Sequence, residues 1–386
     1  MPGSLQEIVL TGGPCAGKTT SLCHLEEKLQ NNGYRVFSVP EAATRLIHPG
    51  IPDLGEIARN NQELYVKIQR CILLKSLEER RHYQKLAQLF VDQGNKAVII
   101  YDRGIMDGQA YLNHSLFASL LEEENISLPQ ARDSYDGIFH LVTAAEGAEE
   151  FYTLENNAAR KETAEQARIL CQETQQAWVG TPHLRIIDNS AGFENKIKRL
   201  EQAVYRIIGI PVPLEIEKKY LLAATPPLTN LRPVQTVDIE QMYILTPEGQ
   251  EMRIRKRSQN GSALYYLTNK KTLRAGVRVE TEKKISSLDY LRLSQQRDQS
   301  TGIIKKHRHC FIYNAQYFEL DTFIEPQNWA GLALLEIELT EENDQVTLPP
   351  GIQIVREVTG DKNFSNHSIA KRADQSVEEN LMHAKK

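Results

Sequence analysis

Two kinds of hydrophobic pattern divide the chain near residue 209. Before that point, short apolar runs of strand length alternate with longer segments in which apolar residues recur every three or four positions. Such an alternation of strands and amphipathic helices predicts an α/β domain with a parallel sheet flanked by helices. Gly209, Pro211 and Pro213 then break the helical pattern, and beyond them apolar and charged residues alternate with a period of two. That period predicts an antiparallel sheet.

The predicted organisation is a first domain over residues 1–208, a linker over 209–213, a second domain over 214–372 and a polar tail over 373–386. In the first domain, strands are expected at 8–10, 35–39, 96–102, 137–142 and 184–188. Helices are expected at 19–29, as one or two helices within 61–93, within the charged segment 149–178, and at 195–208.

Composition excludes several classes of protein. The 386 residues exceed one ordinary core, and 41% are hydrophobic, yet no apolar run is long enough to cross a bilayer. No basic start followed by an apolar core opens the chain, so we expect no secretory leader and a cytoplasmic location. The five cysteines are scattered without a C-x-x-C pair, which is typical of a reducing compartment. A net charge of -4 gives no basic footprint, and no nucleic-acid partner is expected.

The stretch GGPCAGKTT lies where the first predicted strand meets the first predicted helix. It fits the pattern G-x-x-x-x-G-K-[ST], in which backbone N–H groups wrap a polyphosphate. In that pattern Lys18 reaches the terminal phosphates and the Thr19 hydroxyl binds Mg²⁺. We therefore predict a P-loop that binds ATP or GTP with Mg²⁺. Its residues are Gly12, Gly13, Pro14, Cys15, Ala16, Gly17, Lys18, Thr19 and Thr20.

Two acidic residues follow predicted strands, at the sheet edge where α/β proteins bind their ligands. Glu41 is a candidate to hold an acceptor hydroxyl or a water. Asp102 ends a buried strand, where P-loop proteins place the aspartate of the Mg²⁺ shell, although an aspartate there can also cap a turn. Asp107 is close enough in sequence to compete for the same role. Glu41 and Asp102 are therefore candidate site residues at this edge.

The charged segment 149–178 is a candidate lid over the phosphate site. Arg160 or Lys161 would then neutralise charge as the γ-phosphoryl group moves. A solvated helix face explains the same charges equally well.

Beyond residue 214, several predicted strands carry charged side chains at every second position, so that one face of each strand consists of ionised groups, and both signs occur among them. In one arrangement these rows face water above an apolar core. In the other, the strands curl so that the rows line a cavity, where basic groups grip a polyphosphate and acids hold divalent cations. The spacing alone leaves both arrangements open. The rows are Glu215, Glu217 and Lys219; Arg253, Arg255 and Arg257; Arg278, Glu280 and Glu282; Lys306 and Arg308; Glu319 and Asp321; and Glu336 and Glu338.

The runs LTGGPCAGKTT, VPEAATR and YDRG resemble the P-loop kinase-like group often filed as an AAA domain. That group includes the nicotinamide riboside kinase part of the NadR protein and the fly TRP translocation defect protein. The resemblance covers roughly the first 205 residues and implies that the P-loop binds nucleotide phosphates. No pattern of a hexameric AAA machine accompanies it, so no ring is predicted.

The run EIEKK at 215–219 is similar to the E-x-E-x-K signature of the CYTH group, the triphosphate tunnel metalloenzymes. The resemblance spans about 214–370 and implies an α+β antiparallel β-barrel with a charged tunnel. It implies metal ligands or metal-shell acids at Glu215, Glu217, Glu280, Glu282, Asp321, Glu336 and Glu338. It implies triphosphate contacts from Lys219, Arg253, Arg255, Lys270, Lys306 and Arg308. The choices between Lys270 and Lys271, and between Lys305 and Lys306, depend on strand register.

Together these features predict a Mg²⁺-dependent enzyme with Glu41, Asp102, Arg160 and Glu217 in catalytic roles. The first domain would transfer or hydrolyse the γ-phosphoryl group of ATP or GTP. The second would bind, and in one version hydrolyse, a triphosphate or polyphosphorylated ligand, with Mn²⁺ as an alternative metal. The alternative is a nucleotide-dependent switch or adaptor whose barrel reads phosphoinositide headgroups, with peripheral membrane contact and no transmembrane segment. An adenylate cyclase is a third reading that no residue singles out.

Overall fold

The computed structural model describes residues 3–47, 51, 54–152, 163–210, 216–231, 233–246, 250–274, 277–339, 341 and 344–373, with backbone alone for 47, 230, 250, 270–274 and 277–281. The chain forms two compact units, Met1–Ile208 and Gly209–Lys386. Each unit is considered by itself.

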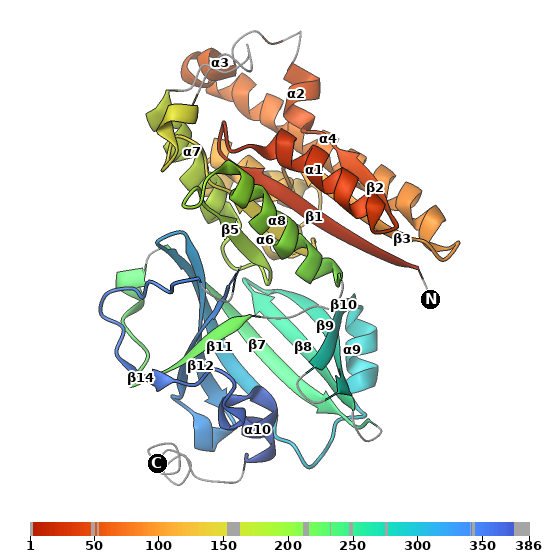
Figure 1. Ribbon diagram of the computed structural model, residues 1–386, viewed down its shortest axis with the longest axis vertical. Coiled ribbons are helices and arrows are strands. Elements are labelled where there is room, and N and C mark those ends of the chain that lie inside the picture. Colours follow the sequence, from red (N-terminus) through yellow and green to blue (C-terminus); the bar gives the residue numbers. More distant parts are fainter. Residues whose placement is uncertain are drawn as a thin grey trace. The chain divides into compact units, whose positions relative to one another are not determined.

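The first unit is built on a five-stranded sheet in the order β2-β3-β1-β4-β5 (Figure 1). All four pairings are parallel. The strands are β1 (Ser4–Gly12), β2 (Tyr34–Val39), β3 (Lys96–Asp102), β4 (Gly137–Leu141) and β5 (Leu184–Ile187). Because the strands are parallel, their carboxyl ends meet at one edge, and this edge carries the P-loop, Glu41 and Asp102.

Helices flank this sheet. The residues Ile8, Val9 and Leu10 of β1 are 0% exposed, as expected for a strand covered on both faces. The segment predicted as one or two helices is a single helix of 30 residues, α4, whose N-cap Asn61 accepts the Leu64 N–H. The other elements are α1 (Lys18–Asn31), α2 (Ala42–Ile47), α3 (Leu54–Asn60), α4 (Gln62–Val91), η1 (Ile105–Tyr111), α5 (His114–Glu123), α6 (Leu128–Arg132), η2 (Glu149–Phe151), α7 (Ala164–Ala177) and α8 (Phe193–Ile208).

The candidate lid segment is helical only in part. Within 149–178, η2 covers the start and α7 begins at Ala164, where Thr163 caps the helix by accepting the Gln166 N–H. Arg160 and Lys161 lie outside the described residues, so their predicted role stays a prediction.

The second unit is built on a nine-stranded sheet in the order β10-β9-β8-β7-β11-β12-β13-β6-β14 (Figure 1). Every pairing is antiparallel, as the period-two pattern predicts. The strands are β6 (Glu217–Leu222), β7 (Val234–Ile244), β8 (Gln250–Gln259), β9 (Ser262–Arg274), β10 (Val277–Ile285), β11 (Ile304–Tyr313), β12 (Gln316–Glu325), β13 (Ala333–Glu338) and β14 (Ile354–Glu357). Short helices accompany them at η3 (Leu228–Leu231), α9 (Ser287–Ser294), η4 (Gln327–Trp329), η5 (Lys362–Phe364) and α10 (Asn366–Lys371).

Strand alternation sorts the side chains of this sheet onto two faces. On β12, Phe318 and Leu320 belong to an apolar cluster, whereas the alternate residues Glu319 and Asp321 lie on the opposite face. Farther along this charged face, Phe323 packs into a second apolar cluster that includes residues of η5 and α10. The row of charged side chains on β12 therefore ends at an apolar cluster.

No helix among the described residues is both long enough and apolar enough to cross a membrane. All five cysteines fall within the described ranges, and none forms a disulfide.

Candidate functional site

The P-loop forms the turn between β1 and α1. Gly17 is the N-cap of α1 with φ 85°, a left-handed conformation that favours glycine, and no side chain caps the helix. A Cβ at Gly17 would stand 2.7 Å from Cε2 of Phe193, so the ring packs directly on this glycine. The first turn of α1 also has no acidic residue. Its unsatisfied N–H groups therefore suit an anion.

Lys18 folds back onto the loop. Its Nζ donates to the carbonyl oxygens of Gly12 and Gly13, at 3.1 and 3.0 Å. Burial, and to a smaller extent Arg103, lower the pKa of Lys18 to about 8, although Asp102 and Glu41 act in the opposite direction. A phosphate group at this place would supply the negative charge that the buried ammonium lacks.

Asp102 lies at the end of β3 and lines the same cavity as Lys18 and Thr19. Its Oδ1 is buried and has no hydrogen-bond partner among the described residues. Burial raises the pKa of Asp102, and Glu41 adds to the rise, although Lys18 opposes it. An unpartnered carboxylate oxygen that lines the same cavity as an exposed threonine fits a Mg²⁺ that binds through one carboxylate, one hydroxyl, phosphates and water.

Asp107, the competing acid, has a different position. It is 3% exposed and accepts hydrogen bonds from the Gly104 N–H at 2.6 Å, Trp178 Nε1 at 3.2 Å and the Thr11 hydroxyl. These three donors engage both oxygens of the carboxylate. Asp107 therefore holds the turn after β3, which leaves Asp102 as the better candidate for the metal shell.

Arg103 is a cavity residue to which the sequence assigns no role. It has φ 69°, which is uncommon for a residue with a side chain, and its Nε lies 2.6 Å from Oε1 of Glu41. Its Nη1 is buried without a hydrogen-bond partner in the described part of the chain. Although burial opposes ionisation, Arg103 and Lys18 hold the pKa of Glu41 below its ordinary value. Only the motif YDRG points to this residue beforehand.

A cavity of 2090 Å³ joins these residues. The P-loop forms one wall, and parts of α2, α3, α4, η1 and α5 form another. In the second wall, Glu79 is 5% exposed and accepts from Arg45 Nη1 at 2.8 Å through Oε1. Its Oε2 is buried and has no partner among the described residues. The cavity thus contains a second carboxylate oxygen that can accept a hydrogen bond from a ligand.

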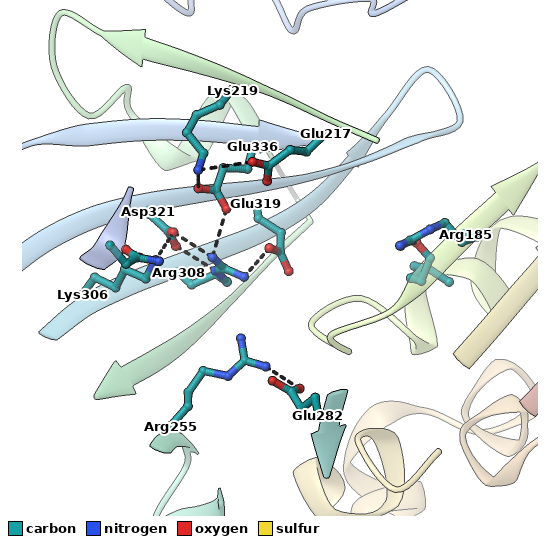
Figure 2. A network of polar contacts seen from close by, with 12 residues as sticks. Arg185, Glu217, Lys219, Arg255, Glu282, Lys306, Arg308, Glu319, Asp321 and Glu336 are labelled. Atoms are coloured by element: carbon teal, nitrogen blue, oxygen red, sulfur yellow. Dashed lines mark hydrogen bonds and ion pairs between the residues drawn. The ribbon is translucent and has the colours of Figure 1, made fainter. Parts of the chain in front are cut away.

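The second unit contains a separate network of charged side chains, drawn in Figure 2. Arg308 on β11 is its centre: Nη2 lies 2.7 Å from Asp321 Oδ2 and 3.3 Å from Glu336 Oε2, and Nη1 pairs with Glu319. Lys306 pairs with Asp321. Lys219 on β6 reaches Glu336 Oε1 at 3.0 Å. The network therefore connects β6, β11, β12 and β13.

This network is buried. Lys306 is 2% exposed and Asp321 is 0% exposed, which excludes a water-facing arrangement for these rows. Burial alone would raise the pKa of Asp321, but Arg308 and Lys306 hold it below its ordinary value. Lys305, by contrast, pairs with the half-exposed Glu325, so Lys306 is the lysine in the row.

Two acids face each other beside this network. Glu217 on β6 is the cross-strand partner of Glu338 on β13, and Lys219 lies 3.7 Å from Glu217. Like charges in register destabilise a sheet unless a cation lies between or near them. No group of three or more His, Cys, Asp or Glu side chains within the described residues is arranged to hold a metal by itself. Lys219 supplies one such cation, and Glu217 and Glu338 are candidates to share a hard cation that takes further oxygen ligands from a phosphate.

Some of the remaining predicted residues have described side chains, and the others lie outside the described part of the chain. Arg253 and Arg255 lie on β8, where Arg255 Nη2 contacts Glu282 Oε1 at 2.7 Å and Glu282 also accepts from the Thr268 hydroxyl. Glu282 thus pairs with an arginine, and Glu319, which belongs to a predicted charged row but not to the predicted metal-shell acids, contacts Arg308. Glu215 lies outside the described residues, as do the side chains of Lys270 and Glu280.

A comparison with known protein families matches part of the first unit. Residues 7–196 match the model of a protein family described as an AAA domain. No curated protein matches the chain. The first unit is thus similar to an AAA domain over these residues, while its relation to the NadR type of kinase stays a prediction.

Several solved structures resemble part of the chain. The inorganic triphosphatase NE1496 shares 27% identity over 41% of this chain and 95% of its own, with a TM-score of 0.31. The PH1819 protein from Pyrococcus horikoshii OT3 shares 21% identity over 34% of this chain and 81% of its own, with a TM-score of 0.27. The putative adenylyl cyclase HpAC1 from Hippeastrum, described as having a dominant triphosphatase activity, shares 18% identity over 33% of this chain and 80% of its own, with a TM-score of 0.26. At TM-scores this low the likeness is weak, and the chemistry of the second unit rests on its own residues.

Proposed function

We propose that the first unit binds ATP or GTP with Mg²⁺ and transfers the γ-phosphoryl group to an acceptor. The observation that carries this proposal is the convergence of Lys18, Asp102 and the Arg103–Glu41 pair on one cavity. A phosphate site, a metal-shell acid and a group that orients an acceptor are the parts that phosphoryl transfer requires.

Each group has a distinct task in this mechanism. The N–H groups at the start of α1 and the Lys18 ammonium stabilise charge on the phosphoryl oxygens. Arg103, with its unpartnered Nη1, adds a second positive group at the transferred phosphoryl. Glu41 accepts a hydrogen bond from the acceptor hydroxyl and so aligns its oxygen with phosphorus. Thr19 and Asp102 would hold the Mg²⁺, which neutralises phosphate charge when bound.

The size of the cavity supports transfer to an acceptor larger than water. Ligand pockets typically measure roughly 300–1,000 Å³, whereas this cavity measures 2090 Å³ and so has room for a second molecule beside a nucleotide. Glu79, whose Oε2 is unpartnered among the described residues, lines this cavity from α4. A hydroxyl-bearing acceptor would satisfy this oxygen.

For the second unit we propose a site for a triphosphate or another polyphosphorylated ligand, at which hydrolysis can occur. Burying so many ionised groups is unfavourable unless each has a partner. Lys219, Arg253, Arg255, Lys306 and Arg308 supply the cations for such an anion. Glu217 and Glu338 would hold Mg²⁺ or Mn²⁺, which polarises a phosphate when bound.

Phosphate transfer and release from ATP and GTP test the first part. In the full chain, Asp102→Asn should lower the rate with Mg²⁺ by at least about tenfold, and a chelator should abolish it. Asp92→Asn is the matched control, because Asp92 is exposed at the end of α4 and does not line the cavity. An unchanged rate in Asp102→Asn would contradict the assignment of the metal shell.

A further inference from the structure

Three large apolar side chains are exposed around the mouth of the first unit's cavity. Phe151 is 69% exposed, Ile169 is 50% exposed and Phe193 is 47% exposed, and all three line the cavity. A single exposed apolar residue is ordinary, but three that converge on one cavity indicate a site for an apolar or aromatic group.

Two of these residues come from the helices that pack on the P-loop. A Cβ at Gly13 would lie 2.8 Å from Cβ of Cys171 on α7, the helix that carries Ile169. The Phe193 ring, at the start of α8, packs on Gly17 in the same way. Phe193 is therefore adjacent to the phosphate-binding loop, and a ring that contacts it can belong to the same ligand as the phosphates.

We infer that Phe151, Ile169 and Phe193 form the nucleobase subsite of the P-loop unit, and that it holds the base by stacking. This inference rests on the proposed nucleotide-binding function. A nucleobase is the planar ring that a nucleoside triphosphate carries beyond its phosphates, and every base has a face that an aromatic or apolar side chain can cover.

Two polar residues that line the cavity together with Phe193 are engaged with the protein. Asn189 donates to the carbonyls of Thr143 at 2.8 Å and Glu146 at 2.7 Å. Lys196 donates to Asn189 Oδ1 at 2.7 Å and to Val142 O at 2.6 Å. These side chains fix the loop between β5 and α8. They therefore have little capacity left to hydrogen-bond the polar edge of a base and so to distinguish adenine from guanine. The subsite therefore accepts adenine and guanine with similar affinity.

The test measures binding of radiolabelled ATP to the full chain with Mg²⁺, and its displacement by unlabelled ATP, GTP or inorganic triphosphate. Only the ATP binding that is lost in Lys18→Ala is attributed to the first unit. ATP that binds to the second unit is thereby left out of the measurement. Phe193→Ala should lower the affinity for ATP and for GTP by about fivefold or more, which is the loss expected for one stacking contact. Displacement by inorganic triphosphate, which has no base, should be unchanged.

Controls separate stacking from folding. Leu89→Ala removes a side chain that is 61% exposed on α4 away from the cavity, and it should bind as the parent does. Phe193→Trp should retain affinity, and Ile169→Ala should show a weaker loss of the same kind. Equal affinity in Phe193→Ala and the parent, or a loss for only one of the two nucleotides, would overturn the inference. An absence of Lys18-dependent ATP binding would instead overturn the proposed function.

Discussion

Arg103 Nε lies 2.6 Å from Glu41 Oε1, which links the ends of two neighbouring parallel strands, β3 and β2, at the cavity. The pair keeps Glu41 ionised and fixes the guanidinium in place. Such preorganised charge is a large contributor to catalysis because it does not have to reorient during the reaction.

Replacing Arg103 by glutamine should therefore lower kcat for nucleotide turnover by about 10²–10³. The reason is the loss of a fixed positive group near the moving phosphoryl group. Steady-state kinetics with ATP or GTP and Mg²⁺ measure this effect. Arg35→Gln is the control, because Arg35 is exposed on β2 and is absent from the cavity lining. Equal losses in both variants would contradict a specific role.

Asp321 should dominate the stability of the second unit. Asp321→Asn leaves Lys306 and Arg308 without their shared carboxylate, and breaking a buried ion pair in this way destabilises by about 3–5 kcal/mol. Denaturant unfolding followed by Trp329 fluorescence, in a Trp178→Phe background, measures this loss. Asp238→Asn breaks a surface pair with His307, Asp238 being 63% exposed, and should change stability by less than about 1 kcal/mol. Similar losses would show that the buried network does not stabilise this unit.

Lys196 should make the stability of the first unit depend on pH. Burial lowers its folded pKa to about 8 from 10.5, and it is 3% exposed. Below pH 8 the lysine is charged in both states, and the folded state bears the burial penalty. Between pH 8 and 10.5 the unfolded state holds more protons, so the free energy of unfolding rises by up to about 3 kcal/mol from this group.

Lys196→Met removes this contribution. The difference in unfolding free energy between parent and variant should grow as the pH rises from 7.5 to 10. Fluorescence of Trp178, in a Trp329→Phe background, follows the first unit. Parallel stability curves over this range would show that Lys196 titrates at its ordinary pKa.

Local pattern was sufficient to predict most of the fold. The apolar runs and turn residues predicted all five strands of the first sheet, and the period-two rows predicted the antiparallel second sheet. The sequence also predicted that the P-loop, Glu41 and Asp102 lie together, because each follows a strand whose carboxyl end must lie at the same edge of the sheet. The alternation of Lys306 and Arg308 likewise placed both on one face.

The sequence did not predict the residues whose positions depend on partners far away in the chain. Arg103 gains its place from a left-handed backbone conformation and from Glu41, 62 positions earlier in the chain. Glu79 matters because α4 turns it into the cavity and leaves one oxygen unpartnered. Nor does alternation show that Glu282 pairs with Arg255, or that the charged rows are buried. Both depend on how strands far apart in sequence pair.

The most direct test of the account is a crossed measurement of phosphate release from ATP, GTP and inorganic triphosphate, with Mg²⁺ or Mn²⁺, by the parent, Lys18→Ala and Glu217→Ala. Glu357→Ala, an exposed acid on β14, is the control. Two independent phosphate sites predict that Lys18→Ala loses turnover of ATP and GTP alone, and that Glu217→Ala loses turnover of inorganic triphosphate alone. Parent rates with every substrate in both variants would contradict both sites, and no release by the parent would contradict hydrolysis in either unit.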